Sequence, residues 1–159
     1  MEDRKPVANF VGREDELGQI LACFSVRSHQ SPHVMILHAL GGQGKSQIAL
    51  EYCRRARQTY RGIFWINANS KSLVPQLYKR MLMQLTSASS SSLPQNSEKI
   101  IEMVKHILEY WQERWLTVFD NYDDPRAFPD IRDFIPSGKC CPRQRLLADR
   151  STQLAMATS

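Results

Sequence analysis

Hydrophobic residues along the chain fall into short unbroken runs and longer stretches with helical spacing. The short runs cover residues 33–38, 62–67 and 115–120, and their apolar centres predict strands that are buried on both faces. Helical spacing is found in five stretches. The first two cover 10–26 and a segment that runs from a glycine-rich stretch to about Arg57. The other three begin at Ser70 or Ser72 and run to about 85, cover 97–111, and cover 127–134. Strands that alternate with helices indicate parallel βαβ units and a three-layer α/β fold.

The apolar stripes of the expected helices predict which faces meet the core. They are Leu17, Ile20, Leu21 and Phe24 in the first helix, Leu73, Leu77, Met81 and Leu85 in the third, and Ile100, Val104, Ile107, Leu108 and Trp111 in the fourth. Ser97 is the expected N-cap of the fourth helix. The Ser-rich stretch 86–97 before it is expected to be a flexible surface loop.

Residues 39–46 read Ala-Leu-Gly-Gly-Gln-Gly-Lys-Ser and lie between the first apolar run and a helical stretch. This order of strand, glycine loop and helix is typical of a phosphate-binding loop, with Ala39 where the first Gly usually stands. Glycines allow backbone N–H groups to point at phosphate oxygens, and the helix N-terminus adds positive charge. The predicted nucleotide contacts are Gly41, Gly42, Gln43, Gly44, Lys45, Ser46 and Gln47. The alternative is a glycine-rich turn that matches the pattern by chance.

An acid at the end of the third apolar run would complete a metal site. Asp120 follows Leu116-Thr117-Val118-Phe119, and P-loop NTPases place an Asp at such a strand end to hold Mg²⁺ together with the Ser or Thr of the loop. We therefore predict Ser46 and Asp120 as the metal-binding residues. The alternative for Asp120 alone is a carboxylate that caps a turn.

Composition excludes several other classes of protein. Of the 159 residues 42% are hydrophobic, which is typical of a globular domain, and no run approaches the length of a membrane span. The four cysteines form no Cys-x-x-Cys pair or metal-ligand cluster, so we expect reduced thiols in a cytoplasmic protein. The net charge of +5 is concentrated after Gly138, which gives little support for specific nucleic-acid binding by the rest of the chain.

Several motifs together resemble an NB-ARC domain, the nucleotide switch of the STAND class of P-loop NTPases, in its fungal NOD-like receptor form. They are Phe10-Val11-Gly12-Arg13-Glu14, the loop Gly41-Gly42-Gln43-Gly44-Lys45-Ser46, Phe64-Trp65-Ile66-Asn67-Ala68 and Phe119-Asp120-Asn121-Tyr122-Asp123-Asp124. The resemblance covers about residues 8–138. It implies a P-loop NTPase fold, ADP or ATP with Mg²⁺ as cofactors, and a cytoplasmic role in signal transduction and innate immunity.

The resemblance also implies roles for individual residues. Val11 would pack near the adenine and Arg13 would help to hold it. The family commonly follows the metal-binding Asp with a second acid, but here Asn121 stands in that place, and an amide cannot act as a base. Asp123 or Asp124 could substitute for that acid. Because Asn121 stands directly after Asp120, we expect the protein to be at most a slow ATPase.

After Gly138 the chain departs from the family pattern. Where a fourth apolar strand is expected, Cys140-Cys141-Pro142-Arg143 opens a basic stretch that is unsuited to a buried strand. We therefore expect an N-terminal extension at 1–9, a truncated NB-ARC domain at 10–138 and a disordered tail at 139–159 that does not belong to the family. A basic tail that binds nucleic acid or anionic lipid is the alternative.

This truncation predicts a parallel sheet of about three strands in the order 2-3-1, with flanking helices. The first strand would then be an exposed apolar edge, and one wall of the nucleotide cleft would be missing, so we expect weak or absent ADP binding. Expected partners are the nucleotide and other NB-ARC proteins, with no membrane. A small active P-loop ATPase or kinase, and an inert fragment or interaction-only protein, remain the alternative functions.

Overall fold

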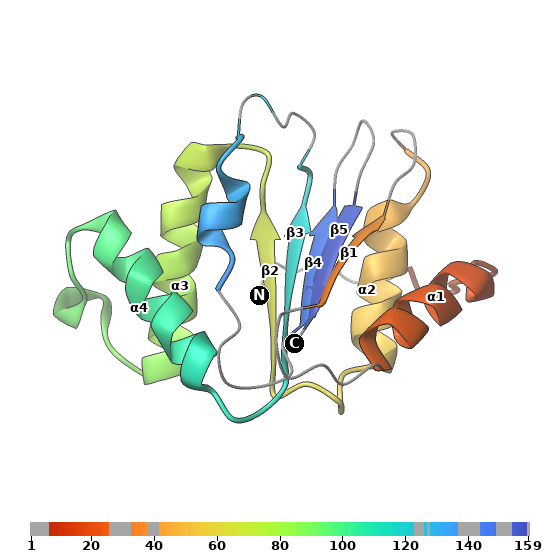
Figure 1. Cartoon of the computed structure of the whole chain (residues 1–159), viewed down its shortest axis with the longest axis horizontal. Coiled ribbons are helices and arrows are strands. Elements are labelled where there is room, and N and C mark those ends of the chain that lie inside the picture. Colours follow the sequence, from red (N-terminus) through yellow and green to blue (C-terminus); the bar gives the residue numbers. More distant parts are fainter. Residues whose placement is uncertain are drawn as a thin grey trace.

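A sheet of five strands lies between two pairs of helices in the computed structural model of the chain (Figure 1). The structure describes residues 7–25, 33–37, 42–122, 126, 128–136, 144–148 and 154–158. Helices α1 and α2 pack on one face of the sheet, and α3 and α4 pack on the other face. This arrangement confirms the α/β fold that the alternation of elements predicts.

The elements follow the predicted order along the chain. The helices are α1 (Glu14–Ser25), α2 (Lys45–Arg55), α3 (Val74–Thr86) and α4 (Ser97–Tyr110), with 3₁₀ turns at Lys71–Leu73, Ser90–Ser92 and Ile131–Phe134. The strands are β1 (His33–Leu37), β2 (Gly62–Asn67), β3 (Trp115–Asp120), β4 (Gln144–Ala148) and β5 (Leu154–Thr158). Among the described residues, no helix has the length and apolar character needed to cross a membrane.

The sheet keeps the predicted relative order 2-3-1 of its first three strands, but it has two further strands between β3 and β1. Its order is β1-β4-β5-β3-β2, so residues 144–148 and 154–158 form strands within the stretch that was expected to be a disordered tail. Strands β1, β4, β3 and β2 run parallel, whereas β5 runs antiparallel to its neighbours. Strand β4 begins after Pro142, which lacks the N–H that a central strand needs, and it supplies a hydrogen-bonding partner to β1. Residues 140–143 lie outside the described residues.

Strand β1 lies at one end of the sheet, and some of its apolar side chains are exposed there. Val34 and Ile36 are each 48% exposed, because α3 and α4 cover the β2 and β3 side of the sheet rather than the β1 side. The predicted apolar edge is therefore present. It does not arise from a missing neighbour as predicted, since β4 pairs with β1 along its full length.

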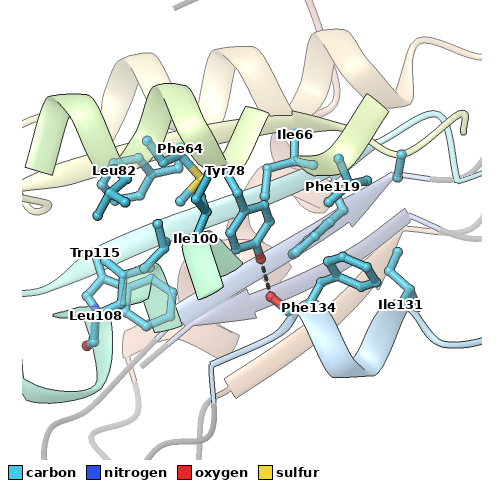
Figure 2. Packing of buried hydrophobic residues seen from close by; sticks show 14 of the residues in the cluster. Phe64, Ile66, Tyr78, Leu82, Ile100, Leu108, Trp115, Phe119, Ile131 and Phe134 are labelled. Atoms are coloured by element: carbon cyan, nitrogen blue, oxygen red, sulfur yellow. Dashed lines mark hydrogen bonds between the residues drawn. The ribbon is translucent and has the colours of Figure 1, made fainter. Parts of the chain in front are cut away.

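The larger hydrophobic core lies between the sheet and the α3–α4 pair (Figure 2). Trp115 is fully buried there, and its indole N–H donates to the carbonyl oxygen of Leu108 at 3.0 Å. The Tyr78 hydroxyl donates to the Phe134 carbonyl oxygen, which ties the last 3₁₀ turn to α3. Both of these buried polar groups thus have a partner, as a dense core requires.

Several details of the helices differ from the predicted pattern, among them Leu21 of the first predicted stripe, which is 58% exposed. The core face of α3 consists of Val74, Tyr78, Met81 and Leu82, whereas Leu73 of the predicted stripe is 41% exposed. The prediction did not count Tyr78 as apolar, and its burial shifts the core-facing side of α3 away from Leu73. The N-cap of α4 is Asn96 rather than Ser97, and its side-chain oxygen accepts from the Glu98 N–H at 2.7 Å.

A charged network joins α1 to α2. Glu51 is only 2% exposed, and it accepts hydrogen bonds from Arg54 and Arg55 at 2.7–2.8 Å. Arg55 also reaches the carboxylate of Glu14 with both terminal nitrogens, at 2.7 and 2.8 Å. The hydrogen bond from Arg54, supported by that from Arg55, lowers the pKa of Glu51 from 4.5 to about 2.

We predict that the substitution Gly62→Ala destabilises the fold. A methyl group at this position would lie 2.8 Å from the Phe64 ring and 3.0 Å from the Trp111 ring, so one of these packed rings must move. Overpacking of this kind costs about 1–3 kcal/mol. Urea unfolding would measure the loss.

The matched control for this substitution is Gly18→Ala in α1, where a methyl group meets no atom within 4 Å. Alanine favours a helix over glycine, so this variant should gain about 0.5–1 kcal/mol. Equal stability of the two variants would show that the ring contacts at Gly62 impose no constraint.

We also predict that Glu51 makes stability depend on pH in the acid range. Its folded-state pKa lies below its unfolded-state value, so its contribution is complete above pH 4.5 and is lost as the pH falls toward about 2. The difference in unfolding free energy between the native chain and Glu51→Gln should therefore be largest near neutrality and shrink through this window. Urea unfolding at a series of pH values tests this, and a constant difference would contradict it.

Candidate functional site

The glycine loop meets α2 in a conformation that suits only glycine. Gly42 and Gly44 both have φ of 79°, and a Cβ at either position would meet no protein atom within 4 Å. Gly44 is the N-cap of α2, and no side chain caps this helix start. The space and the N–H groups at this end of the helix therefore suit an anionic oxygen ligand such as a phosphate.

Lys45 and Ser46 form the first turn of α2 and face the end of β3. Lys45 is 8% exposed, so its long side chain is held within the structure rather than in solvent. The Ser46 hydroxyl donates to Oδ1 of Asp120 at 2.8 Å, although the two residues are 74 positions apart in the chain. The two residues predicted as metal ligands thus lie in direct contact.

The carboxylate of Asp120 is 1% exposed and its position is tightly determined. Its Oδ1 also accepts from the backbone N–H of Asn121 at 3.0 Å, and its backbone carbonyl accepts from the Ala68 N–H at 2.7 Å. A buried carboxylate needs such donors, because an unpaired charge in the interior is costly.

A pair of asparagines lies beside this carboxylate. Asn67 is opposite Asp120 in the β2–β3 register, and its Oδ1 accepts from the Asn121 side-chain amide at 3.2 Å. Asn121 has a left-handed backbone with φ of 60°, a conformation that Asn tolerates better than most residues. Sequence reasoning missed Asn67 as a site residue. The sequence feature that could have identified Asn67 is its place at the end of an apolar run, which it shares with Asp120.

The Gly-Arg-Glu segment lies in a strap that we define as residues 7–14. The Val7 N–H donates to Oε1 of Gln47 at 3.1 Å, next to the glycine loop. Val11 is 86% exposed, and Arg13 forms an ion pair with Glu16 at 2.7 Å. The strap is therefore attached near the phosphate end of α2 while the two predicted base contacts face solvent.

The remaining predicted site residues divide into two groups. Gln43 is exposed and Gln47 is partly buried at the start of α2. Gly41, Asp123 and Asp124 lie outside the described residues.

The donors at this site fit Mg²⁺ bound together with a nucleotide. Magnesium prefers oxygen ligands and usually keeps several waters beside one or two protein ligands and phosphate oxygens. The hydroxyl of Ser46 and the carboxylate of Asp120 supply two such oxygens. Within the described part of the chain no group of three His, Cys, Asp or Glu side chains could hold a metal.

Three cavities of the structure lie away from this site. Two of them, of about 250 and 570 Å³, share Ile63, Phe64 and Gln84 and lie beside β2. The third, of about 290 Å³, lies between α1 and α2 and is bounded by Glu14 and Arg55. Lys45, Ser46 and Asp120 line none of the three.

Comparisons with known proteins agree with a nucleotide-binding module. A family model described as an AAA ATPase domain matches residues 9–157. A protein of the fungus Hyaloscypha variabilis named "Nucleotide-binding leucine-rich repeat (NLR)-like protein" is 26% identical over 121 residues. That match covers 74% of this chain and 12% of the relative, so the chain spans a small part of that protein. No solved structure matches the chain.

We predict that Gly44→Ala lowers stability although space is available for the methyl group. An alanine must adopt the left-handed conformation at φ of 79°, which costs about 1–2 kcal/mol. The exposed neighbour Gln43 is the control, because Gln43→Ala should change the unfolding free energy by less than about 0.5 kcal/mol. Urea unfolding of both variants tests this, and equal stabilities would argue against a required left-handed residue.

Proposed function

Because the chain belongs to the AAA ATPase domain family, we propose that it is the Mg-nucleotide-binding module of an NB-ARC-type signalling switch. The family match supports nucleotide binding by a P-loop NTPase, and the NLR-like relative supports the receptor context. The narrower assignment to the NB-ARC class rests on the ordered motifs of the sequence.

The single observation that carries this proposal is the contact between Ser46 and Asp120. A hydroxyl at the start of a helix and a carboxylate at the end of a parallel strand, 2.8 Å apart, form the pair that holds Mg²⁺ in P-loop NTPases. A glycine-rich turn with a chance match to the loop pattern would have no reason to face a buried carboxylate.

We assign the following roles within this proposal. The backbone N–H groups from Gly42 to Gln47 bind the phosphates, and Lys45 neutralises their charge. Ser46 and Asp120 hold Mg²⁺, which when bound screens the phosphate oxygens. Val11 and Arg13 contact the adenine.

Slow or absent hydrolysis is the expected behaviour of this site. Asn121 follows the metal-binding Asp120, and its amide donates to Asn67 and has no basic lone pair with which to take a proton from water. A protein that binds nucleotide without rapid turnover remains in one nucleotide state for a long time. This property suits a switch better than it suits a metabolic enzyme.

The expectation of weak ADP binding rested on the absence of a strand beside β1. Strand β4 pairs with β1 at every position from His33 to Leu37, so that reason no longer applies. We therefore expect the chain to bind ADP measurably in the presence of Mg²⁺.

Calorimetric titration with Mg-ADP tests the proposal. Lys45→Ala removes a buried cation and Asp120→Asn removes the metal-binding charge, so each should weaken binding by at least about 10-fold, which corresponds to about 1.4 kcal/mol. Lys99→Ala on α4, far along the chain from the loop, serves as a charge-matched control. Lack of ADP binding by the native chain, or equal binding by Lys45→Ala, would contradict the proposal.

Turnover measurements separate a switch from a working ATPase or kinase. Release of inorganic phosphate from Mg-ATP should stay well below the typical enzyme rate of about 10 s⁻¹. Robust multiple turnover that Lys45→Ala abolishes would instead support an enzyme.

A further inference from the structure

The strap at residues 7–14 is attached to α2 at both of its ends. Near its start the Val7 N–H donates to Gln47, in the first turn of α2, and at its end Glu14 pairs with Arg55, the last residue of α2. Gln47 and Arg55 are eight positions apart in the helix, which is about 12 Å along the axis. The strap therefore follows the helix whose N-terminus carries the phosphate loop.

Between the two attachments the strap adopts a conformation that requires support. Gly12 and Arg13 both have positive φ, at 79° and 61°. For a long side chain such as Arg13 the left-handed region is unfavourable by about 1–2 kcal/mol. Positions of this kind persist only where the surrounding structure holds them.

The attachment at Glu14 is the stronger of the two. Two terminal nitrogens of Arg55 meet both oxygens of Glu14 at 2.7 and 2.8 Å, a bidentate pair. The Arg55 Nε donates to Glu51 at 2.7 Å, so the guanidinium is oriented by a carboxylate that is itself only 2% exposed. An isolated surface ion pair contributes little, but bidentate geometry within a network is the exception to that rule.

We propose that Arg55, oriented by Glu51 and bound to Glu14, is a positioning residue that holds the strap so that the nucleoside half of a nucleotide can bind. This inference rests on the proposed function of the site. Arg55 belongs to the helix that starts at the phosphate loop, and Glu14 directly follows the Val11–Arg13 turn. The pair therefore sets the distance between the part of the site that binds the base and the part that binds the phosphates.

The positioning role has a consequence that a purely structural role lacks. Loss of the Arg55–Glu14 pair should weaken binding of a ligand with a base and leave binding of phosphate alone unchanged. General destabilisation of α2 would weaken both ligands together, because the helix start binds the phosphates of each.

The neighbouring arginine provides a matched control. Arg54 also donates to Glu51, at 2.7 and 2.8 Å, and the hydrogen bonds described for its side chain stay within α2. Arg54→Gln removes the same charge from the same helix without touching the bond to the strap. Glu14→Gln breaks the bond from the other side, at a carboxylate that is 64% exposed, and leaves Glu51 fully paired.

The test compares Mg-ADP with Mg-pyrophosphate by calorimetry for the native chain, Arg55→Gln, Glu14→Gln and Arg54→Gln. We expect Arg55→Gln and Glu14→Gln to bind ADP about 5-fold more weakly, equivalent to about 1 kcal/mol, with unchanged affinity for pyrophosphate. Arg54→Gln should bind both ligands like the native chain. Glu14→Asp, which keeps the charge, should restore part of the ADP affinity.

Two results would overturn the inference while leaving the proposed function intact. One is unchanged ADP binding in Arg55→Gln and Glu14→Gln. The other is an equal loss of ADP and pyrophosphate binding, which would show that Arg55 only stabilises the helix. A native chain that binds neither ligand would overturn the proposed function itself.

Discussion

The arrangement of the site depends on the buried carboxylate of Asp120. Asp120 lies at the end of β3, 1% exposed, and a carboxylate in such a place is stable only with donors around it. Ser46 at the start of α2 and the N–H of Asn121 supply two of them. To bring Ser46 there, β1 must run parallel to β3 and end at the same edge of the sheet. The arrangement of the first strand, the glycine loop and α2 follows from this requirement.

The two helical layers contribute differently around that charge. The α3–α4 layer carries the larger hydrophobic core, with Trp115 and Phe119 of β3 fully buried beneath it. This layer packs on β3 and thereby fixes the place of Asp120 at the end of that strand. The α1–α2 layer carries the glycine loop and the strap, and it is joined by ionic contacts of Glu14, Glu51 and Arg55 as well as by apolar packing. The larger apolar core thus lies on one face of the sheet, and the helix that carries the glycine loop lies on the other.

The predicted elements agree with the structure where a pattern is long and chemically distinct. The runs at 62–67 and 115–120 are β2 and β3 with the predicted bounds, because short segments with a mainly apolar centre and a polar last residue favour a buried strand. The core face of α3 was predicted less well, because Tyr78 is buried although tyrosine is not strictly apolar. The N-cap of α4 was off by one residue, since neighbouring Asn96 and Ser97 are both good caps and only the backbone decides between them.

The sequence by itself predicted the α/β class and picked out the glycine loop together with the pair Ser46 and Asp120, because each depends on residue types at characteristic spacing. Tertiary structure alone decided that β4 and β5 lie between β1 and β3, since β4 is short, lies beyond Pro142 and is recognised by its pairing with β1 and β3. It also decided the contacts of Asn67 with Asn121 and of Arg55 with Glu14, which join residues 54 and 41 positions apart. Such pairs leave no periodic signal in a single chain, because their partners meet only after the sheet and its helices have packed.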